Sequence, residues 1–161
     1  MKLDAYDKKI LAELQGNGGL SNQELAERVG LSPSPCSRRV RQLELAGVIR
    51  ERAVRLDPAS LGLDLSVLIQ IRMDRHTPER FDQFESAVRQ YPEVQECYLI
   101  TGHDADYQLK VSVPNMDEYQ NFLLNKITKI DGVIGVHSSF VLRKAVDTTR
   151  LPLDYIDKRR V

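Results

Sequence analysis

Three arginines that follow small hydroxyl residues are the clearest candidates for chemistry in this sequence. Arg38, Arg39 and Arg41 lie between Ser32 and Leu43, and the interval contains no acidic residue. Guanidinium groups bind guanine edges and phosphate oxygens, and small hydroxyls near a helix amino terminus let that helix approach a major groove closely. The segment therefore has the composition of a DNA-reading helix, although a short basic run by itself is equally typical of a solvated helix face.

Helical spacing divides this segment into two faces. At 100° per residue, Cys36, Val40 and Leu43 fall on an apolar side that can pack inside a domain. The opposite side, spaced i, i+3, i+4 and i+7 from Ser34, is polar and basic, which favours contact with DNA over a solvated face. The residues that we expect to contact DNA are Ser32, Ser34, Pro35, Ser37, Arg38, Arg39, Arg41 and Gln42.

Two shorter helices are predicted before this one. The first begins after Asp4, which can cap it, and the second begins at Ser21, where Glu24 three residues later completes a capping box. Gly30 ends the second helix, and Pro33 occupies the first position of the third, where its missing N–H costs nothing. A link this short between two helices is the spacing of a helix-turn-helix.

The third helix is predicted to run to Gly47, after which the character of the chain changes. Residues 48–56 are rich in β-forming side chains and indicate a wing or a linking strand. The arginines of this segment either contact DNA phosphates or keep an edge strand soluble, and its pattern leaves both readings open. They are Arg50, Arg52 and Arg55. Asp57 and Pro58 then break the pattern and mark a hinge.

Beyond Leu63 the apolar period changes from 3.6 to 2, which predicts strands. The predicted elements are a strand over 63–73, a helix from Thr77 to Tyr91, strands over 94–101 and 107–113, a helix from Asn115 to Asp131 and a strand over 133–142. This β-α-β-β-α-β order is the ferredoxin-like arrangement, with both helices on one side of a sheet. The predicted fold class is therefore α+β, a winged helix-turn-helix domain followed by a ferredoxin-like domain. Because one sheet face is uncovered and apolar side chains are available for both, we expect a homodimer with facing sheets.

Composition excludes several classes of protein. The 161 residues are 42% hydrophobic, and 23 Lys+Arg balance 23 Asp+Glu, as in an ordinary globular protein. No apolar stretch approaches the roughly 20 residues that cross a bilayer, and the amino-terminal residues do not form a secretory signal, so a cytoplasmic protein is expected. The three histidines are scattered, and neither a phosphate loop nor a metal-ligand spacing accompanies them. We therefore expect neither an enzyme nor a cofactor.

Three segments carry a resemblance to a known family. They are Leu20–Cys36, with the sequence LSNQELAERVGLSPSPC, Arg39–Glu44 followed by Gly47–Ile49, and Val94–Tyr98 with the sequence VQECY. With them, the chain resembles the Lrp/AsnC transcription regulators over nearly its whole length. The resemblance implies double-stranded DNA as a partner, a carboxy-terminal domain that senses a small amino acid such as leucine, and dimers that assemble further, commonly to octamers.

The resemblance also implies where an effector binds. The family places it between dimers, near a Gly-x-x-Asp-Tyr loop that joins the second and third strands; here the loop from Gly102 to Tyr107 is one residue longer. A carboxylate suits an α-amino group, and loop N–H groups suit an α-carboxylate. The expected ligand-binding residues are Gly102, His103, Asp104, Asp106, Tyr107, Ser138, Ser139 and Phe140. Turn capping by the acidic residues and sheet packing by residues 138–140 are the plainer alternatives.

These inferences give a domain plan and two candidate functions. The plan has a helix-turn-helix domain over 1–50, a linking strand and hinge over 51–62, a sensing and oligomerisation domain over 63–146, and a tail over 147–161. The favoured function is a sequence-specific transcriptional regulator whose DNA binding is modulated by an amino acid bound between dimers. The alternative is an architectural DNA-binding protein that needs no effector.

Overall fold

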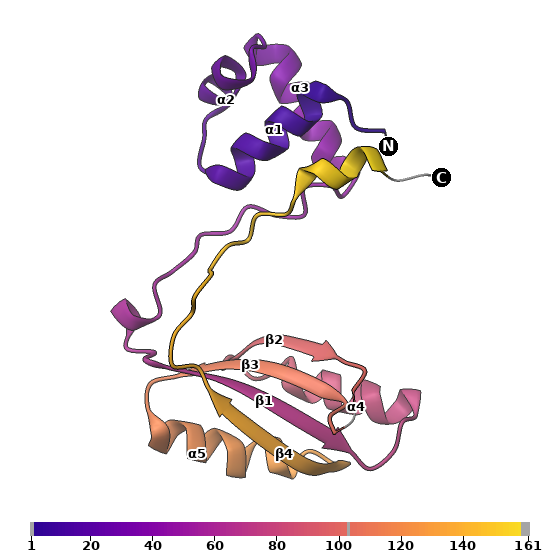
Figure 1. Ribbon diagram of the computed structural model, residues 1–161, viewed down its shortest axis with the longest axis vertical. Helices are drawn as coiled ribbons and strands as arrows, with labels where there is room; N and C mark the ends of the chain where they lie inside the picture. The colour runs from indigo at the N-terminus through magenta and orange to yellow at the C-terminus, as the bar shows by residue number, and fades with distance from the viewer. Residues whose placement is uncertain (1, 103, 159–161) are drawn as a thin grey trace. The chain divides into compact units, whose positions relative to one another are not determined.

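The computed structural model describes residues 2–102 and 104–158, and these fall into two compact units (Figure 1). The described residues within 1–55 and 146–161 form a helical unit, and residues 56–145 form a sheet unit. Each unit has its own apolar core. The chain therefore passes between the units twice, and its last segment belongs to the helical unit instead of forming a tail of its own.

Three helices build the helical unit: α1 (Ala5–Gly16), α2 (Asn22–Val29) and α3 (Pro33–Leu45). Capping boxes begin α1 at Asp4 and α2 at Ser21, and Gly30 ends α2 with a φ of 75°, in the left-handed region that favours glycine. The helix α3 ends two residues earlier than predicted, and the Ser32 side chain makes no capping hydrogen bond. The predicted apolar face is confirmed, because Cys36, Val40 and Leu43 are all buried in the core.

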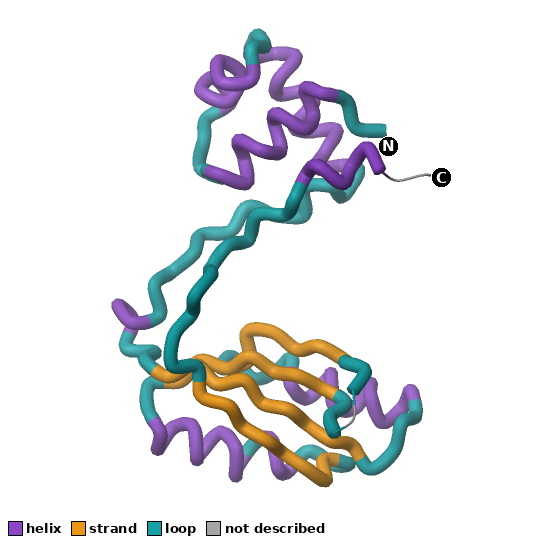
Figure 2. Tube along the Cα trace, in the orientation of Figure 1, coloured by secondary structure: helices purple, strands orange, loops and turns teal. Residues whose placement is uncertain are grey.

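The segment that follows α3 is not a strand. Residues 50–57 are loop, which Figure 2 shows in teal, and a short 3₁₀ helix over Ala59–Leu61 comes next. The predicted linking strand is therefore wrong for this segment. Its β-forming composition is insufficient, because a strand also requires a neighbour that accepts and donates its backbone hydrogen bonds.

The returning segment packs on the helical unit through side chains of α1. The amide of Gln15 makes two hydrogen bonds with the backbone of Leu151, accepting from its N–H at 2.6 Å and donating to its carbonyl at 3.2 Å. Leu153, at the start of a 3₁₀ helix over Leu153–Lys158, packs against the core of the three helices. Arg55 and Asp147 form an ion pair of 2.5 Å. These contacts explain why residues after 146 group with the helical unit.

This packing predicts unequal effects for two neighbouring leucines. Leu153→Ala should lower the stability of the helical unit by about 1–2 kcal/mol, because a partly buried side chain leaves the core. Leu151→Ala should change it by less than about 0.5 kcal/mol, because that side chain is 72% exposed and only its backbone is bonded. Hydrogen exchange of the α1 amides measures the stability of the helical unit in each variant. Equal losses of stability in the two variants would contradict the proposed role of Leu153.

The sheet unit has the predicted ferredoxin-like topology. Its elements, in chain order, are β1 (Leu65–Met73), α4 (Pro78–Val88), β2 (Val94–Leu99), β3 (Tyr107–Val113), α5 (Met116–Asn125) and β4 (Val133–Phe140). The strand order is β2-β3-β1-β4, and every neighbouring pair is antiparallel. Phe84 of α4 and Phe122 of α5 pack in one core with the buried face of β1, so both helices cover the same side.

The uncovered face of the sheet is more polar than expected. On β1 the residues that alternate with the buried ones are Ser66, Leu68, Gln70 and Arg72, of which only Leu68 is apolar. Beside Leu68, Lys110 of β3 pairs with Glu96 of β2 at 3.0 Å. A second copy that covers this face must therefore satisfy polar groups as well as bury apolar area.

Candidate functional site

The polar stripe of α3 lies on the surface of the helical unit. Ser34, Ser37, Arg38, Arg41 and Gln42 are all exposed, and so is Ser32, whereas Pro35 is partly buried. Because the opposite side of α3 is anchored in the core, the stripe keeps a fixed orientation on a rigid helix. An exposed basic face of this kind on the second helix of a helix-turn-helix fits a major groove.

Arg39 is the exception among the predicted DNA contacts. Its Nη1 lies 2.7 Å from Asp4 Oδ2 and 2.8 Å from Asp7 Oδ1, and its side chain is only 27% exposed. The ring of Tyr6 lies 5.5 Å from the guanidinium carbon. Arg39 therefore ties α3 to the start of α1, which makes it a structural residue in place of a DNA contact.

The two carboxylates that hold Arg39 belong to the capping box of α1. The backbone N–H of Asp7 donates to Asp4, and together with Arg39 it lowers the pKa of the Asp4 carboxyl. The carboxylates in turn raise the pKa of Arg39, with the Asp4 hydrogen bond as the largest cause. The sequence identified Asp4 only as a helix cap, because its second role depends on a residue 35 positions away.

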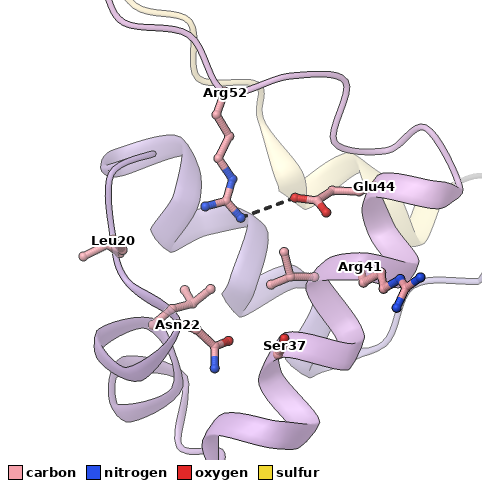
Figure 3. Close-up of a pocket in the computed structure, with 8 residues that line it drawn as sticks. Leu20, Asn22, Ser37, Arg41, Glu44 and Arg52 are labelled. Carbon is pink, nitrogen blue, oxygen red and sulfur yellow. Dashed lines mark hydrogen bonds and ion pairs between the residues drawn. The ribbon is translucent and has the colours of Figure 1, made fainter.

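A hollow of about 370 Å³ opens beside α3 (Figure 3). Its floor is apolar and its rim is polar and charged, and it is lined by Leu20, Asn22, Leu25, Ser37, Val40, Arg41, Glu44 and Arg52. Two predicted DNA contacts, Ser37 and Arg41, share it with Arg52, which comes from the loop after α3. Sequence reasoning missed Asn22 and Glu44, because only the folded unit brings them to this place.

In the loop between β2 and β3, Asp106 is already engaged. Its Oδ2 accepts the Met73 N–H at 2.7 Å, its Oδ1 lies 2.7 Å from His76 Nε2, and its own N–H donates to the Ile71 carbonyl at 2.8 Å. Asp106 therefore fastens the loop to the end of β1. Free electron pairs remain on both carboxylate oxygens, but the group is only 17% exposed.

Tyr107 is a core residue. Its side chain is fully buried, its ring lies 4.5 Å from that of Phe84, and its hydroxyl donates to Glu85 Oε1 at 2.9 Å. Burial, followed by the carboxylate of Glu85, raises the pKa of Tyr107 well above its usual range. The aromatic side chain predicted to contact an effector is thus enclosed by α4 and the sheet. Gly102 and Asp104 are exposed, and His103 lies outside the described residues.

The other predicted ligand residues lie on the edge strand β4, which β1 separates from β3 and the β2–β3 loop. The Ser138 hydroxyl is hydrogen-bonded to the Tyr119 hydroxyl on the helix side, and the ring of Phe140 packs edge-on against Tyr119 at 5.3 Å. Ser139 is exposed on the uncovered face, opposite Leu68.

The strand register separates these residues from the β2–β3 loop. The loop joins the sheet opposite Ile71, whereas Ser138 and Phe140 pair with Ile69 and Val67, about 7 and 13 Å away along β1 at 3.3 Å per residue. Figure 1 shows β4 ending at the opposite end of the sheet from this loop. One chain alone therefore does not bring the two sets together.

Within residues 2–102 and 104–158, no three His, Cys, Asp or Glu side chains are arranged to hold a metal ion. None of the helices described is long and apolar enough to cross a membrane.

Models of protein families match both units in the order in which they occur. A winged helix-turn-helix DNA-binding model matches residues 3–50, and the Lrp/AsnC ligand binding domain matches residues 66–151. The first match contains α1 to α3, and the second contains the four-stranded sheet from the second residue of β1 onward.

Relatives of known name align along almost the whole chain. The leucine-responsive regulatory proteins of Escherichia coli K12 and Klebsiella pneumoniae are each 42% identical over 149 residues, which cover 92% of this chain and 90% of theirs. A transcriptional regulator of Neisseria meningitidis, solved in complex with L-Met, is 43% identical with a TM-score of 0.91 and covers 96% of this chain and 99% of that one. An AsnC family regulator of Agrobacterium tumefaciens is 40% identical with a TM-score of 0.89 and covers 95% and 99%. This protein therefore belongs to the Lrp/AsnC family of DNA-binding transcriptional regulators, which are not enzymes.

Proposed function

We propose that a small amino acid binds between copies of this chain and thereby changes how the protein binds DNA. The observation that carries the proposal is the separation of the two predicted ligand sets, by about 7–13 Å along the sheet and by the intervening strand β1. The β2–β3 loop of one copy can meet strand β4 of another copy, whereas within one chain the two sets of residues lie apart. The L-Met complex of the Neisseria meningitidis regulator supports an amino acid as the class of ligand.

The chemistry of the loop suits this ligand. Asp104 is an exposed carboxylate that can receive an α-amino group, and Gly102 has open space around its backbone for an approaching α-carboxylate. Asp106 holds the loop in place through Met73 and His76, so we assign it to positioning instead of direct contact. Ser139 and Phe140, both exposed at the end of β4, are the residues of the second set that a neighbouring copy can reach.

Assembly links this site to DNA. In a dimer, two copies of α3 related by a two-fold axis read half-sites about 34 Å apart, one turn of the duplex. Further assembly of dimers, up to an octamer, creates the interfaces between copies that the ligand occupies. An amino acid that favours one arrangement of dimers shifts the population toward it and changes the spacing of the α3 helices along DNA.

Thermal unfolding in the presence of each amino acid at millimolar concentration tests the proposal. A ligand at a hundredfold excess over its Kd should stabilise the protein by about 2.7 kcal/mol, and we expect this for one or a few amino acids. Asp104→Asn should abolish the shift without changing ligand-free unfolding, whereas Asp106→Asn should also lower ligand-free stability because it loosens the loop. If no amino acid shifts unfolding while the protein binds DNA, an architectural role replaces this proposal.

A further inference from the structure

One acidic side chain stands on the face of α3 that we assign to DNA. Glu44 follows Ser37 and Arg41 at helical spacing and lines the same hollow, and it is the single acid in the sequence of α3. A carboxylate at this position repels phosphates, so its presence calls for an explanation from its contacts. Its partner is Arg52, whose Nη2 lies 3.4 Å from Glu44 Oε1.

Arg52 is placed to do more than neutralise Glu44. Figure 3 shows its side chain reaching from the loop after α3 toward the hollow, with the guanidinium beside Glu44. The pair is open to solvent, since the side chains of Arg52 and Glu44 are 41% and 46% exposed. A phosphate that enters the hollow can therefore reach the guanidinium without a rearrangement of the core.

Arg55, in the same loop, also forms an ion pair, but its partner and its position differ from those of Arg52. Arg55 pairs with Asp147 of the returning segment at a shorter distance, 2.5 Å, and does not line the hollow. Arg52 thus combines access to the face of α3 with a long, exposed and replaceable ion pair. Exposed pairs of this kind contribute little stability, so exchanging the partner costs little.

We propose that Glu44 restrains Arg52 in the free protein and that a DNA phosphate replaces Glu44 as its partner on binding. Glu44 then acts as an internal competitor of the DNA backbone, and it lowers affinity for duplexes of any sequence. A backbone contact of this kind carries no base information, so it sets the level of non-specific binding while α3 reads bases. This inference rests on the proposal that α3 reads DNA. It adds that Glu44 controls how strongly Arg52 attracts the DNA backbone.

The test compares two substitutions that change charge equally. Glu44→Gln should tighten binding to a mixed-sequence duplex about two- to fivefold at low salt, since the free energy of an exposed pair no longer opposes phosphate binding. Glu51→Gln removes the same charge from an exposed position next to Arg52 in the chain and should give a clearly smaller gain. Both variants should unfold at the wild-type midpoint, because neither side chain is in the core.

The same measurements in an Arg52→Gln background decide the mechanism. We expect the gain of Glu44→Gln to fall to the level of Glu51→Gln when Arg52 is absent, because no guanidinium remains to be released. If the full gain of Glu44→Gln persists without Arg52, or if Glu44→Gln and Glu51→Gln bind DNA equally well while Arg52 is present, Glu44 acts as a general charge and the inference is wrong. Failure of the wild type to bind any duplex at low salt would instead contradict α3 as a DNA-binding helix, and this inference with it.

Discussion

Replacing Gly132 with alanine should lower the free energy of unfolding of the sheet unit by about 2–4 kcal/mol, because backbone strain and steric overlap add. Gly132 has a φ of 90°, a conformation that L side chains rarely adopt. A Cβ at this position would lie 2.5 Å from the Arg80 Cδ and 2.9 Å from the Asp74 Oδ1. Arg80 has little freedom to move away, because its Nε pairs with Asp74 at 3.1 Å and its Nη1 donates to Gln83 at 3.2 Å.

Alanine substitutions at two other glycines distinguish the cost of backbone strain from the cost of steric overlap with Arg80 and Asp74. Gly62 has a φ of 73° with nothing within 4 Å of an added Cβ, so Gly62→Ala should cost only about 1 kcal/mol from the backbone. Gly102 has open space and no positive φ, so Gly102→Ala should change stability by less than about 0.5 kcal/mol. Hydrogen exchange of the β1 amides reports on the sheet unit, and a Gly132→Ala effect no larger than that of Gly62→Ala would show that Arg80 moves aside without cost.

The turn that contains Gly132 is also connected to the proposed effector loop, which joins β2 and β3. The Asp74 N–H donates to the Gly132 carbonyl at 2.8 Å, and the preceding residue, Met73, donates to Asp106. The turn before β4, the end of β1 and the β2–β3 loop are therefore linked through consecutive backbone groups. We expect Gly132→Ala to weaken the amino-acid response as well as the fold, because the loop loses part of its support.

The spacing of apolar and capping residues predicted the structural features that depend only on nearby residues in the chain. The apolar faces of α3 and β1, the cap at Asp4, the capping box at Ser21 and the order of the elements all follow from spacing of a few residues, and the structure confirms them. Spacing also places Asn115 at the start of the predicted second helix of the sheet domain, and its side chain caps α5 by accepting from the Glu118 N–H.

Features that depend on residues far apart in the chain could not be predicted from the sequence pattern. Nothing local in the pattern around Leu153 indicates that it packs on a core 100 residues away. Tyr107 belongs to a family motif, which drew attention to ligand contact, yet it shares the buried face of β3 with Leu109 and alternates with the partly buried, polar Gln108 and Lys110. The segment after α3 had strand-forming residues but no partner strand, which composition alone does not reveal.

Adjacent arginines of α3 should give opposite results when each is replaced by alanine. Arg38→Ala should weaken binding to a selected operator by about 5- to 150-fold, corresponding to a lost base contact of roughly 1–3 kcal/mol, with unfolding unchanged. Arg39→Ala should instead lower the stability of the helical unit by about 1–3 kcal/mol, between the values for exposed and buried pairs, since it leaves the buried carboxylate of Asp7 without its cation. A duplex selected by the wild type from a random library serves as the operator.

The comparison is sharp because both changes remove one positive charge from neighbouring positions on the same helix. Any loss of binding that comes from net charge alone must appear equally in the two variants, so the excess in Arg38→Ala reports a direct contact with DNA. A contact with a base weakens binding to the operator more than binding to a mixed-sequence duplex. Measuring affinity well below the unfolding temperature of the Arg39 variant keeps its α3 in place. If Arg39→Ala then weakens operator binding as much as Arg38→Ala does, the guanidinium leaves Asp4 and Asp7 to bind DNA, and the structural assignment of Arg39 is wrong.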